Sequence, residues 1–421
     1  MRGSSMTDIG EFNEKLVLQT IRSAPEGIGQ SDVVRRSHLS RQAVSLITRR
    51  LLGDGLIEQA GRRISGPGKP HTLLRVVADA RLAIGVHLDP AHITVVVCDL
   101  AARPVARATL EPPTEDPQAD IARIADAIGA LTRSLGARPS EPVEDPAERH
   151  ERSEAQEALP AGRRLLGIGI AAPAGLDAEA GILRDPPWMP GWRDVPVVDA
   201  LSAATGLPAM LDKDTNAALT GEIWSRHLDA SQTVLYLYVG HGVGSAISAN
   251  GRVHRGGSTQ AGEVGHLPIG RAGEICSCGR AGCLSLYTDA HVLVGRARSL
   301  GVPLPAGDDM TAALTALSQA AEDGSDAARG VIADHGIALG AAVRLLAGIH
   351  DPRRIIIGGP TWPALSSVGT ARVREALADW LIEDRAVLEN SRLGDDGGAI
   401  GAASLFLDQE LAPGTPGPSP F

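Results

Sequence analysis

Four potential metal ligands in one short stretch constrain this chain of 421 residues more than any other feature. An imidazole is followed, at spacings of 10, 12 and 17 residues, by three thiols. The four residues are His266, Cys276, Cys278 and Cys283. Three thiolates and one imidazole complete the tetrahedral shell of a structural zinc ion and leave no position for a reacting water. Gly279 and Gly282 allow the loop to turn back on itself. We therefore expect a Zn²⁺ cofactor that fixes this loop and takes no part in chemistry.

A chance cluster or an oxidised cysteine pair is the alternative. Outside the cluster the chain has one cysteine, Cys98, which lies in a β-like run. We expect no secretory leader, and disulfides are rare in proteins that remain in a reducing compartment. The ligand spacing therefore favours zinc.

Length and composition are those of an ordinary globular protein. A chain of this length predicts two or three domains. No run of about 18 apolar residues occurs, so we expect no membrane span and a cytoplasmic location. Residues 1–5 resemble an expression scar before a native start at Met6.

One region carries a charge opposite to that of the whole chain. The net charge of the protein is −10, yet residues 35–75 contain nine Lys or Arg and only two acidic residues, Asp54 and Glu58. A basic module on an acidic body indicates a polyanionic partner for that module alone. A solvated basic surface without a partner is the alternative.

The N-terminal region has the pattern of three short helices. Apolar residues repeat at helical spacing from Phe12 to Ile21, and we expect Ser31 to cap a short helix over residues 32–36. Ser40 is expected to cap a third helix, whose outer side carries groups that can reach base edges or phosphates in a major groove. The candidate DNA-binding residues of this helix are Ser40, Arg41, Gln42, Ser45, Thr48 and Arg49.

A basic hairpin rich in Gly and Pro follows the third helix. A strand is expected from Leu56, then a tip over residues 61–70, then a strand over 71–77. Arg62, Arg63 and Lys69 are candidates for phosphate or minor-groove contacts. Helix, turn, helix and hairpin predict a winged helix-turn-helix domain over residues 7–78 that binds double-stranded DNA. A generic three-helix bundle, the alternative, requires neither the polar face nor the basic tip.

Strands alternating with helices predict an α/β body over residues 79–410. The β-like runs are 82–88, 93–100, 165–172, 233–239, 246–248 and 355–357, and the helical patterns are 121–135, 197–205, 215–224, 289–299 and 336–349. The segment 136–162 has almost no large apolar side chain, which predicts a disordered insertion. Residues 411–421 are expected to form a disordered tail.

Glycine-bearing stretches punctuate the body in a fixed order. They are residues 173–175, 240–244, 262–266 and 358–360, and they occur together with the Asp-Lys-Asp-Thr-Asn-Ala-Ala stretch of residues 212–218 and the His/Cys₃ loop. In this order they resemble the ROK family of repressors, open-reading-frame proteins and sugar kinases, over roughly residues 82–407. The resemblance implies a two-lobed, actin-like or hexokinase-like body of ribonuclease H-like type, with a sugar in the cleft. The family's regulators also carry an N-terminal winged helix.

The resemblance implies roles for particular residues of the cleft. Asp214 stands where family kinases place the carboxylate that deprotonates the sugar hydroxyl. Glu263 and His266 match a Glu-x-x-His motif whose side chains hydrogen-bond the sugar. His266 would then hold zinc through one ring nitrogen and face the ligand with its other edge. A solvated carboxylate is the alternative for Glu263.

Departures from the family pattern distinguish a sensor from a kinase. The first phosphate loop, Asp-x-Gly-x-Thr in the kinases, is replaced by residues 87–92, which lack glycine and threonine, and Pro90 has no N–H donor. In the second loop His241 replaces a hydroxyl residue. Three candidate ligand-binding positions around the sugar also differ from the family, namely Trp188, Lys213 and Ser285. Lys213 predicts a more positive pocket that favours an acidic or phosphorylated sugar, and Trp188 offers a stacking face. A pocket that binds nothing is the alternative.

Together these features predict a DNA-binding transcriptional repressor that senses a sugar or sugar derivative and is not an enzyme. We expect it to bind a palindromic operator as a homodimer or homotetramer. Two alternatives remain, an active sugar kinase with an accessory DNA-binding domain and a regulator controlled by a protein partner.

Overall fold

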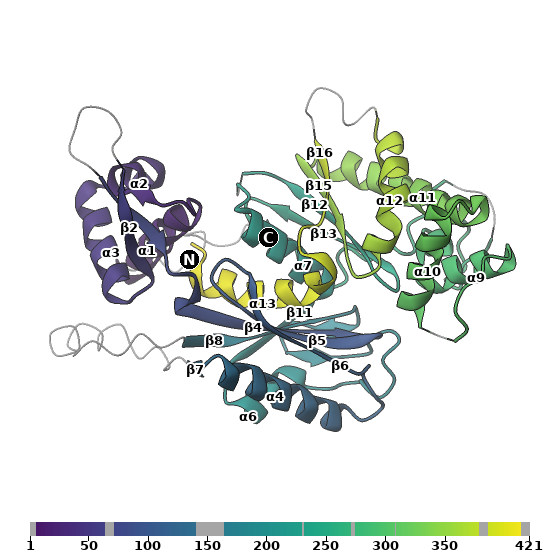
Figure 1. Cartoon of the computed structure of the whole chain (residues 1–421), viewed down its shortest axis with the longest axis horizontal. Helices are drawn as coiled ribbons and strands as arrows, with labels where there is room; N and C mark the ends of the chain where they lie inside the picture. Colours follow the sequence, from purple (N-terminus) through teal and green to yellow (C-terminus); the bar gives the residue numbers. More distant parts are fainter. Residues whose placement is uncertain are drawn as a thin grey trace.

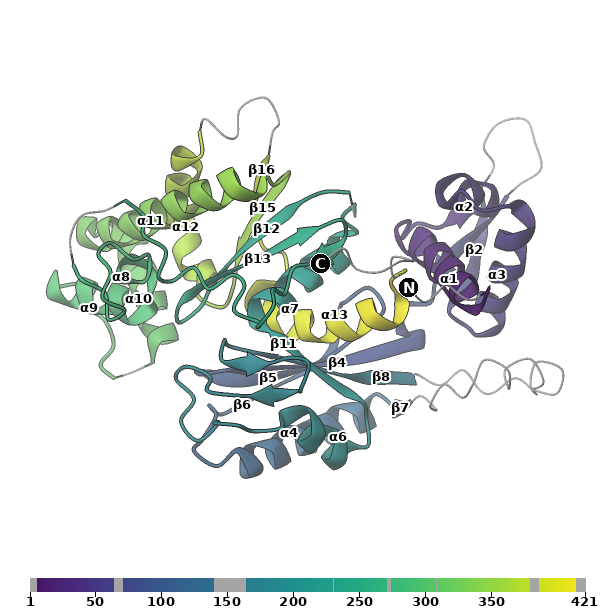
Figure 2. The same cartoon turned by 180° about the vertical axis from the view of Figure 1, so that it is seen from behind.

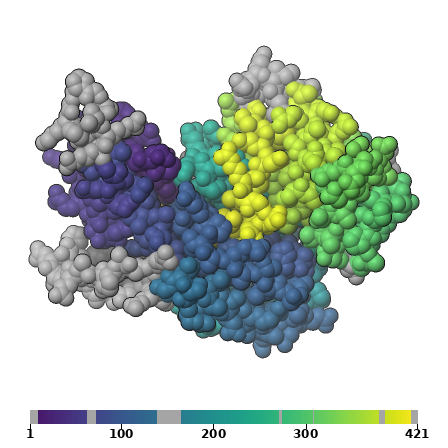
Figure 3. Space-filling view, in the orientation of Figure 1, coloured from purple at the N-terminus to yellow at the C-terminus, as the bar shows by residue number. Residues whose placement is uncertain are grey.

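The structure of the chain, a computed structural model, describes residues 6–63, 71–139, 164–229, 231–270, 274–307, 309–378 and 386–413. An N-terminal module lies beside a body of two lobes (Figure 1). In the space-filling view the module forms a lobe of its own on one side of the body (Figure 3). The expected scar, residues 64–70 of the expected hairpin tip, most of the insertion and residues 414–421 of the tail lie outside the described residues, whereas residues 61–63 of the expected tip continue strand β2.

The module combines helices with a small antiparallel sheet, as a winged helix-turn-helix requires. Its strand order is β1-β3-β2. The elements are α1 (Met6–Arg22), β1 (Ile28–Gly29), α2 (Gln30–Ser37), α3 (Arg41–Gly53), β2 (Ile57–Arg63) and β3 (His71–Val76).

One of the two expected helix caps is present. The Ser40 hydroxyl accepts a hydrogen bond from the Ala43 N–H at 3.1 Å and caps α3. The prediction that Ser31 caps α2 is wrong, because that helix begins at Gln30 directly after Gly29 and has no side-chain cap. Gly29 is held in an extended conformation by pairing with β3, so the helix starts at the next residue.

The lower lobe is built on one mixed sheet. Its strands run in the order β11-β8-β4-β5-β6, with β7 paired to β8, and α4 and α6 lie along the outer side of the sheet (Figure 1). The elements are η1 (Ala78–Ala80), β4 (Arg81–Asp89), β5 (His92–Cys98), β6 (Pro104–Leu110), α4 (Pro117–Ser134), β7 (Arg138–Pro139), β8 (Arg164–Ala172), β9 (Leu176–Asp177), β10 (Ile182–Leu183), α6 (Val197–Thr205) and β11 (Ala209–Lys213). Because β7 joins this sheet, the start of the expected insertion is structured.

The upper lobe repeats this topology. Its sheet order is β14-β13-β12-β15-β16. In each sheet the three strands that come first in the chain pair in antiparallel fashion, β4-β5-β6 in the lower lobe and β12-β13-β14 in the upper lobe. The two later strands lie on the other side of β4 or β12 and run parallel to it. The elements are β12 (Val234–Val239), β13 (Val243–Ala249), β14 (Arg252–Val253), α8 (Ser285–Thr288), α9 (Ala290–Ser299), α10 (Met310–Glu322), α11 (Asp326–His350), β15 (Arg354–Gly358), α12 (Trp362–Ala376) and β16 (Val387–Asn390). This duplicated sheet confirms the predicted actin-like body.

Two helices cross at the junction of the lobes. Helix α7 (Asp214–Arg226) follows the last strand of the lower sheet, and α13 (Gly397–Leu411), after η3 (Gly394–Asp396), follows the last strand of the upper sheet. Glycines permit their close contact, because a Cβ on Gly401 would lie 2.3 Å from the Ala217 carbonyl oxygen. A Cβ on Gly169 of β8 would likewise lie 1.8 Å from the Ala402 oxygen. Helix α13 therefore lies directly on the lower sheet (Figure 2).

Hydrophobic periodicity did not reveal every element. Strand β6 and helices α10, α12 and α13 are absent from the sequence-based prediction, and α11 begins ten residues before the predicted residue 336. Helix α13 is buried from Gly397 to Leu407, so it has no polar face to alternate with an apolar one. A helix that is apolar all round carries no amphipathic signal.

Helix α11 is the one segment among the described residues that is long and apolar enough to cross a membrane. Its most apolar window has a mean hydropathy of 1.4, and 56% of that window is buried inside the protein. Its inward side belongs to the upper-lobe core, with Leu339 and Val343 fully buried. These contacts are those of a core helix.

A buried histidine on α11 makes stability depend on pH. His335 is fully buried against Trp362, and neither ring nitrogen has a hydrogen-bond partner among the described residues. Burial lowers the pKa of His335 to about 4. Because the unfolded chain binds a proton at higher pH than the native state, stability should fall as pH drops from about 6.5 towards 4.

The unfolding free energy of the wild type should decrease between pH 7 and pH 5, and we predict that this decrease is smaller by roughly 2 kcal/mol in His335→Leu. Urea unfolding at both pH values measures this difference. His291→Leu, which alters an exposed histidine, should leave the pH dependence as in the wild type. Equal pH dependence in the wild type and in His335→Leu would contradict the prediction.

Candidate functional site

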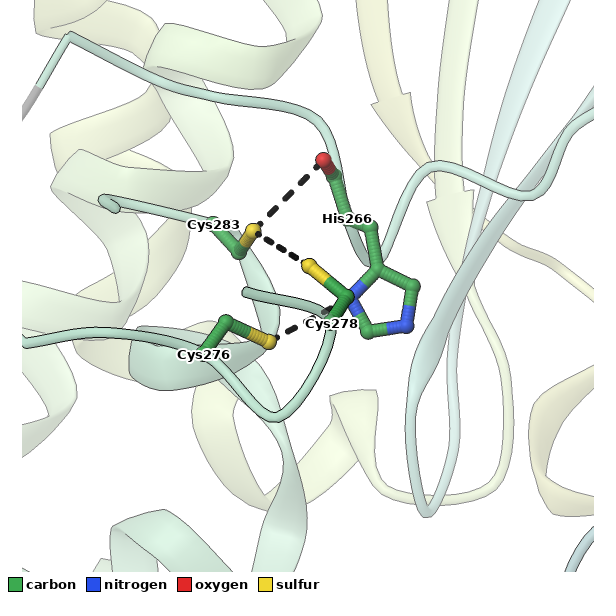
Figure 4. A group of neighbouring side chains, drawn as sticks. All are labelled: His266, Cys276, Cys278 and Cys283. Atoms are coloured by element: carbon green, nitrogen blue, oxygen red, sulfur yellow. Dashed lines mark hydrogen bonds between the residues drawn. The ribbon is translucent and has the colours of Figure 1, made fainter. Parts of the chain in front are cut away.

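The four predicted zinc ligands converge on one point of the upper lobe. His266 comes from the loop after β14, and the three cysteines come from the turn before α8 (Figure 4). The Cys276 Sγ lies 3.4 Å from the His266 Nδ1, and the Cys278 and Cys283 Sγ atoms are 3.5 Å apart. All four ligand atoms lie within 4.8 Å of one another.

These distances fit a tetrahedral zinc ion. Ligands about 2.0 to 2.3 Å from a central ion are separated by roughly 3.3 to 3.8 Å along the edges of a tetrahedron. A disulfide would bring two sulfur atoms to about 2 Å, and the Cys278–Cys283 separation of 3.5 Å is much longer. Gly279 and Gly282 have φ angles of +82° and +69°, so both glycines serve the turn as expected. In this arrangement the residues could hold zinc as a structural ion.

The second ring nitrogen of His266 points away from the three thiols (Figure 4). The hydroxyl of Ser285, another predicted ligand residue, lies 3.7 Å from the Cys276 Sγ. Ser285 therefore contacts the cysteine cluster.

Asp214 is the first residue of α7 and directly follows β11, the last strand of the lower sheet. Its carboxylate accepts a hydrogen bond from the Thr215 N–H at 2.6 Å. Burial raises the pKa of Asp214 to about 7, although the neighbouring Lys213 ammonium opposes this shift. Near neutral pH this carboxyl group can therefore accept a hydrogen bond from a hydroxyl when it is ionised, or donate one to a hydroxyl when it is protonated.

The charge of Lys213 is already balanced inside the protein. Its side chain is 2% exposed, and its ammonium forms an ion pair with Glu263 and donates a hydrogen bond to the Ala261 carbonyl at 3.1 Å. The prediction of an ammonium directed at an acidic ligand is therefore not supported. The neighbouring Asp212 carboxylate pairs with Arg255 at 2.6 Å.

The two lobes approach each other at Trp188 and His241. Trp188 lies in the lower-lobe segment before α6, and its ring centroid is 6.2 Å from that of His241, in the turn between β12 and β13. Its φ of +60° is uncommon for a bulky residue. The side chain is 54% exposed, so its role as a stacking face for a ligand stays a prediction.

The turn between β4 and β5 has no free backbone donor of the kind that holds phosphate. The Asp89 carboxylate is 4% exposed and accepts the Ala91 N–H at 2.8 Å. Pro90 has no N–H to offer. His241 faces this carboxylate, with its Nδ1 3.7 Å from an Asp89 oxygen. The position therefore presents negative charge to any approaching anion.

The outer face of α3 carries most of the predicted DNA-binding residues. Arg41, Gln42 and Arg49 are exposed, and Ser45 is partly exposed. The prediction for Thr48 is wrong, because Thr48 is 4% exposed and its hydroxyl donates a hydrogen bond to the Val44 carbonyl at 2.8 Å. A threonine that bonds back into its own helix turns away from solvent.

The hairpin residues are described only in part. Arg62 and Arg63 end strand β2, opposite Thr72 and His71, and a bulge precedes them. Their side chains and Lys69 lie outside the described residues.

Comparison with known proteins assigns the body to a family. The family model described as "ROK family" matches residues 153–409, which is more than half of the chain. The chain belongs to the ROK family.

Both kinases and repressors are among the ROK proteins that this chain resembles. A glucokinase from Halalkalibacterium halodurans is 34% identical over 261 residues, which cover 58% of this chain and 77% of the relative. A putative xylose repressor from Caldicellulosiruptor sp. is 27% identical over 420 residues, which cover 96% of this chain and 97% of the relative. A solved ROK transcriptional regulator, a homologue of the Escherichia coli Mlc protein, superposes with a TM-score of 0.72 at 21% identity and covers 96% of this chain and 98% of its own, which establishes the shared fold.

We predict that purified ROK protein carries about one zinc ion and that Cys278→Ser removes most of it. The variant should also unfold at a lower temperature, because ligand binding and loop folding are coupled. Plasma mass spectrometry measures the metal. Cys98→Ala, outside the cluster, should retain wild-type zinc content. Wild-type protein without zinc after chelator-free purification would refute the assignment.

Proposed function

We propose that this protein is a DNA-binding transcriptional repressor whose ROK body senses a sugar or sugar derivative without phosphorylating it. The observation that carries the proposal is the combination of an exposed basic face on α3 with a cleft that lacks a phosphate grip. The xylose repressor relative, matched over nearly its whole length, supports the regulator. We expect a cytoplasmic homodimer or homotetramer on a palindromic operator, with zinc in the His266 loop.

The cleft argues against phosphoryl transfer on electrostatic grounds. Kinases need backbone donors and small residues around the phosphates. Here the Asp89 carboxylate occupies the one N–H of the turn, from Ala91. A buried carboxylate at this place repels a nucleotide phosphate instead of binding it. The glucokinase relative makes kinase activity the alternative.

The effector is proposed to be an uncharged sugar. Lys213 and Glu263 neutralise each other, and Asp212 is neutralised by Arg255. Asp214 remains as the group that can exchange hydrogen bonds with hydroxyls, and its raised pKa suits a neutral ligand. Trp188 supplies exposed aromatic surface for the apolar side of a sugar ring.

Helix α7 offers a direct connection from the effector to the DNA-binding module. Asp214 is its first residue, and Trp224 lies in its last turn. The Arg22 guanidinium, at the end of α1, stacks 3.8 Å from the centroid of the Trp224 ring and donates a hydrogen bond to the Trp224 carbonyl at 2.8 Å. A shift of α7 on ligand binding would therefore move α1, and allosteric coupling requires only that the ligand prefer one of the two arrangements.

The DNA-binding proposal is tested most safely with point variants, because the module shares one hydrophobic core with α13. Replacing Arg49 by Ala should weaken operator binding and lower the slope of log affinity against log salt by about one, as the loss of one phosphate contact would. Arg374→Ala, on α12, is the control with the same change of charge. Fluorescence anisotropy at several salt concentrations measures both. Wild-type slopes in both variants would contradict the assignment of α3.

We predict that Asp214→Asn abolishes sugar-induced release from DNA but retains DNA binding. The raised pKa means that the ionised carboxylate destabilises the fold as pH rises from about 4 through 7. Asp214→Asn should therefore increase the melting temperature of the ligand-free protein at pH 8. If the ionised Asp214 carboxylate instead stabilised the fold, Asp214→Asn would lower the melting temperature at pH 8. Hexose- and ATP-dependent ADP formation by the wild type would overturn the proposed absence of kinase activity.

We predict that Arg22→Gln uncouples the two functions. The variant should bind sugar and operator with affinities close to those of the wild type, whereas the change in operator affinity caused by sugar should fall from roughly 5- to 150-fold towards none. Arg372→Gln, on α12, is the matched control. Calorimetry gives the sugar affinity, and anisotropy with and without sugar gives the coupling. A full sugar response in Arg22→Gln would exclude this route.

A further inference from the structure

The reading face of α3 contains an apolar residue that the fold does not need. The other large apolar residues in the middle of the helix face inward, since Val44 and Leu51 are fully buried and Ile47 is 9% exposed. Leu46 is 60% exposed. Single exposed leucines are common on protein surfaces. Exposure alone therefore does not indicate a function for Leu46, whereas the place of the residue on the helix does.

Leu46 lies at the centre of the predicted DNA-contacting surface. It follows Gln42 by four residues and precedes Arg49 by three, which places all three on one side of the helix. Both neighbours are exposed, and Ser45 beside them is partly exposed. The leucine is therefore surrounded by groups that hydrogen-bond to bases and phosphates.

We propose that Leu46 reads a thymine, through contact with its C5 methyl group in the major groove. This inference rests on the proposed DNA binding by α3. The thymine methyl is the one apolar group that a base pair presents in the major groove, and apolar side chains recognise it by contact. A polar base edge opposite Leu46 would instead lose its water without gaining a hydrogen bond.

The spacing of the face also predicts what lies beside that thymine. Gln42 and Leu46 are one helical turn apart, about 6 Å along the axis, and base pairs are stacked about 3.4 Å apart. Gln is the side chain that pairs in bidentate fashion with adenine. Each half-site should therefore contain an adenine within about two base pairs of the thymine that Leu46 contacts.

The test removes one methyl group from the DNA. Operator sequences are first selected from random duplexes with the full-length protein, and each thymine of a half-site is then replaced in turn by deoxyuridine. At one position per half-site the wild type should lose about fourfold in affinity, the value for one buried methyl. In Leu46→Ala the same replacement should have no effect, so the coupling between residue and methyl is measured directly.

Two further variants separate this role from a general effect on the module. Leu46→Met keeps an apolar side chain and should retain the sensitivity to deoxyuridine. Ile9→Ala, on α1, removes another exposed apolar side chain, 47% exposed, and should behave as the wild type. Because Leu46 is exposed, Leu46→Ala should keep the wild-type melting temperature.

The outcomes distinguish the inference from the function on which it rests. Sensitivity to deoxyuridine that is present in the wild type and lost in Leu46→Ala supports the contact. An identical deoxyuridine profile in both proteins, or no sensitive position in the wild type, overturns it while DNA binding stands. Failure to select any duplex contradicts the proposed DNA binding itself, and with it the contact between Leu46 and a thymine methyl group.

Discussion

The packing of α13 against glycine-lined surfaces determines how the parts of this molecule are held together. Gly85 and Gly169 of the lower sheet let the helix backbone approach, and a Cβ on either would lie within 2 Å of a carbonyl oxygen of α13. Helix α13 is the last element of the upper half, so this contact joins the two lobes. Its final turn also accepts a hydrogen bond from Gln19 of α1 at 3.0 Å, through the Leu411 carbonyl. Close-packed surfaces of this kind have few alternative arrangements. Displacement of one lobe is therefore expected to move the other lobe and α1 as rigid bodies.

Charge balance in the cleft follows from the same packing. Elements that meet at the lobe junction bury several carboxylates, and a buried charge is tolerated only when it is paired or protonated. The buried Asp212 carboxylate has a cationic partner in Arg255, and the buried Lys213 ammonium pairs with the more exposed Glu263. Burial raises the pKa of Asp214 to about 7. In the proposed function this electrostatic arrangement, more than the presence of any family motif, is the reason to expect an uncharged effector.

The sequence predicted those features that depend on local pattern. The His/Cys₃ cluster was predicted because four rare side chains occur at a fixed spacing. Helix α3 was predicted because it has a capping serine and an apolar stripe at helical period. The sequence could not predict α13, whose burial on all sides removes the periodic signal. It also misjudged Thr48 and Lys213, because a side chain's orientation depends on contacts with distant residues. The partner of Lys213, Glu263, is far along the chain and belongs to a different element, and neither composition nor spacing reports such a pair.

The structure also explains how a kinase-like body can serve a regulator with few changes. In the proposed function α7 must be rigid, because it positions Asp214, the carboxylate proposed to bind the sugar. Rigidity makes both ends of the helix move together, so a module attached at the far end responds to the ligand without a dedicated relay. In this protein the attachment is made by Arg22 on Trp224, where burial lowers the pKa of the guanidinium to about 9. An arginine that has given up part of its hydration for an aromatic face and a carbonyl is costly to displace. If α7 moves, the module is therefore expected to move with it, because breaking the contact between Arg22 and Trp224 costs more than following the helix.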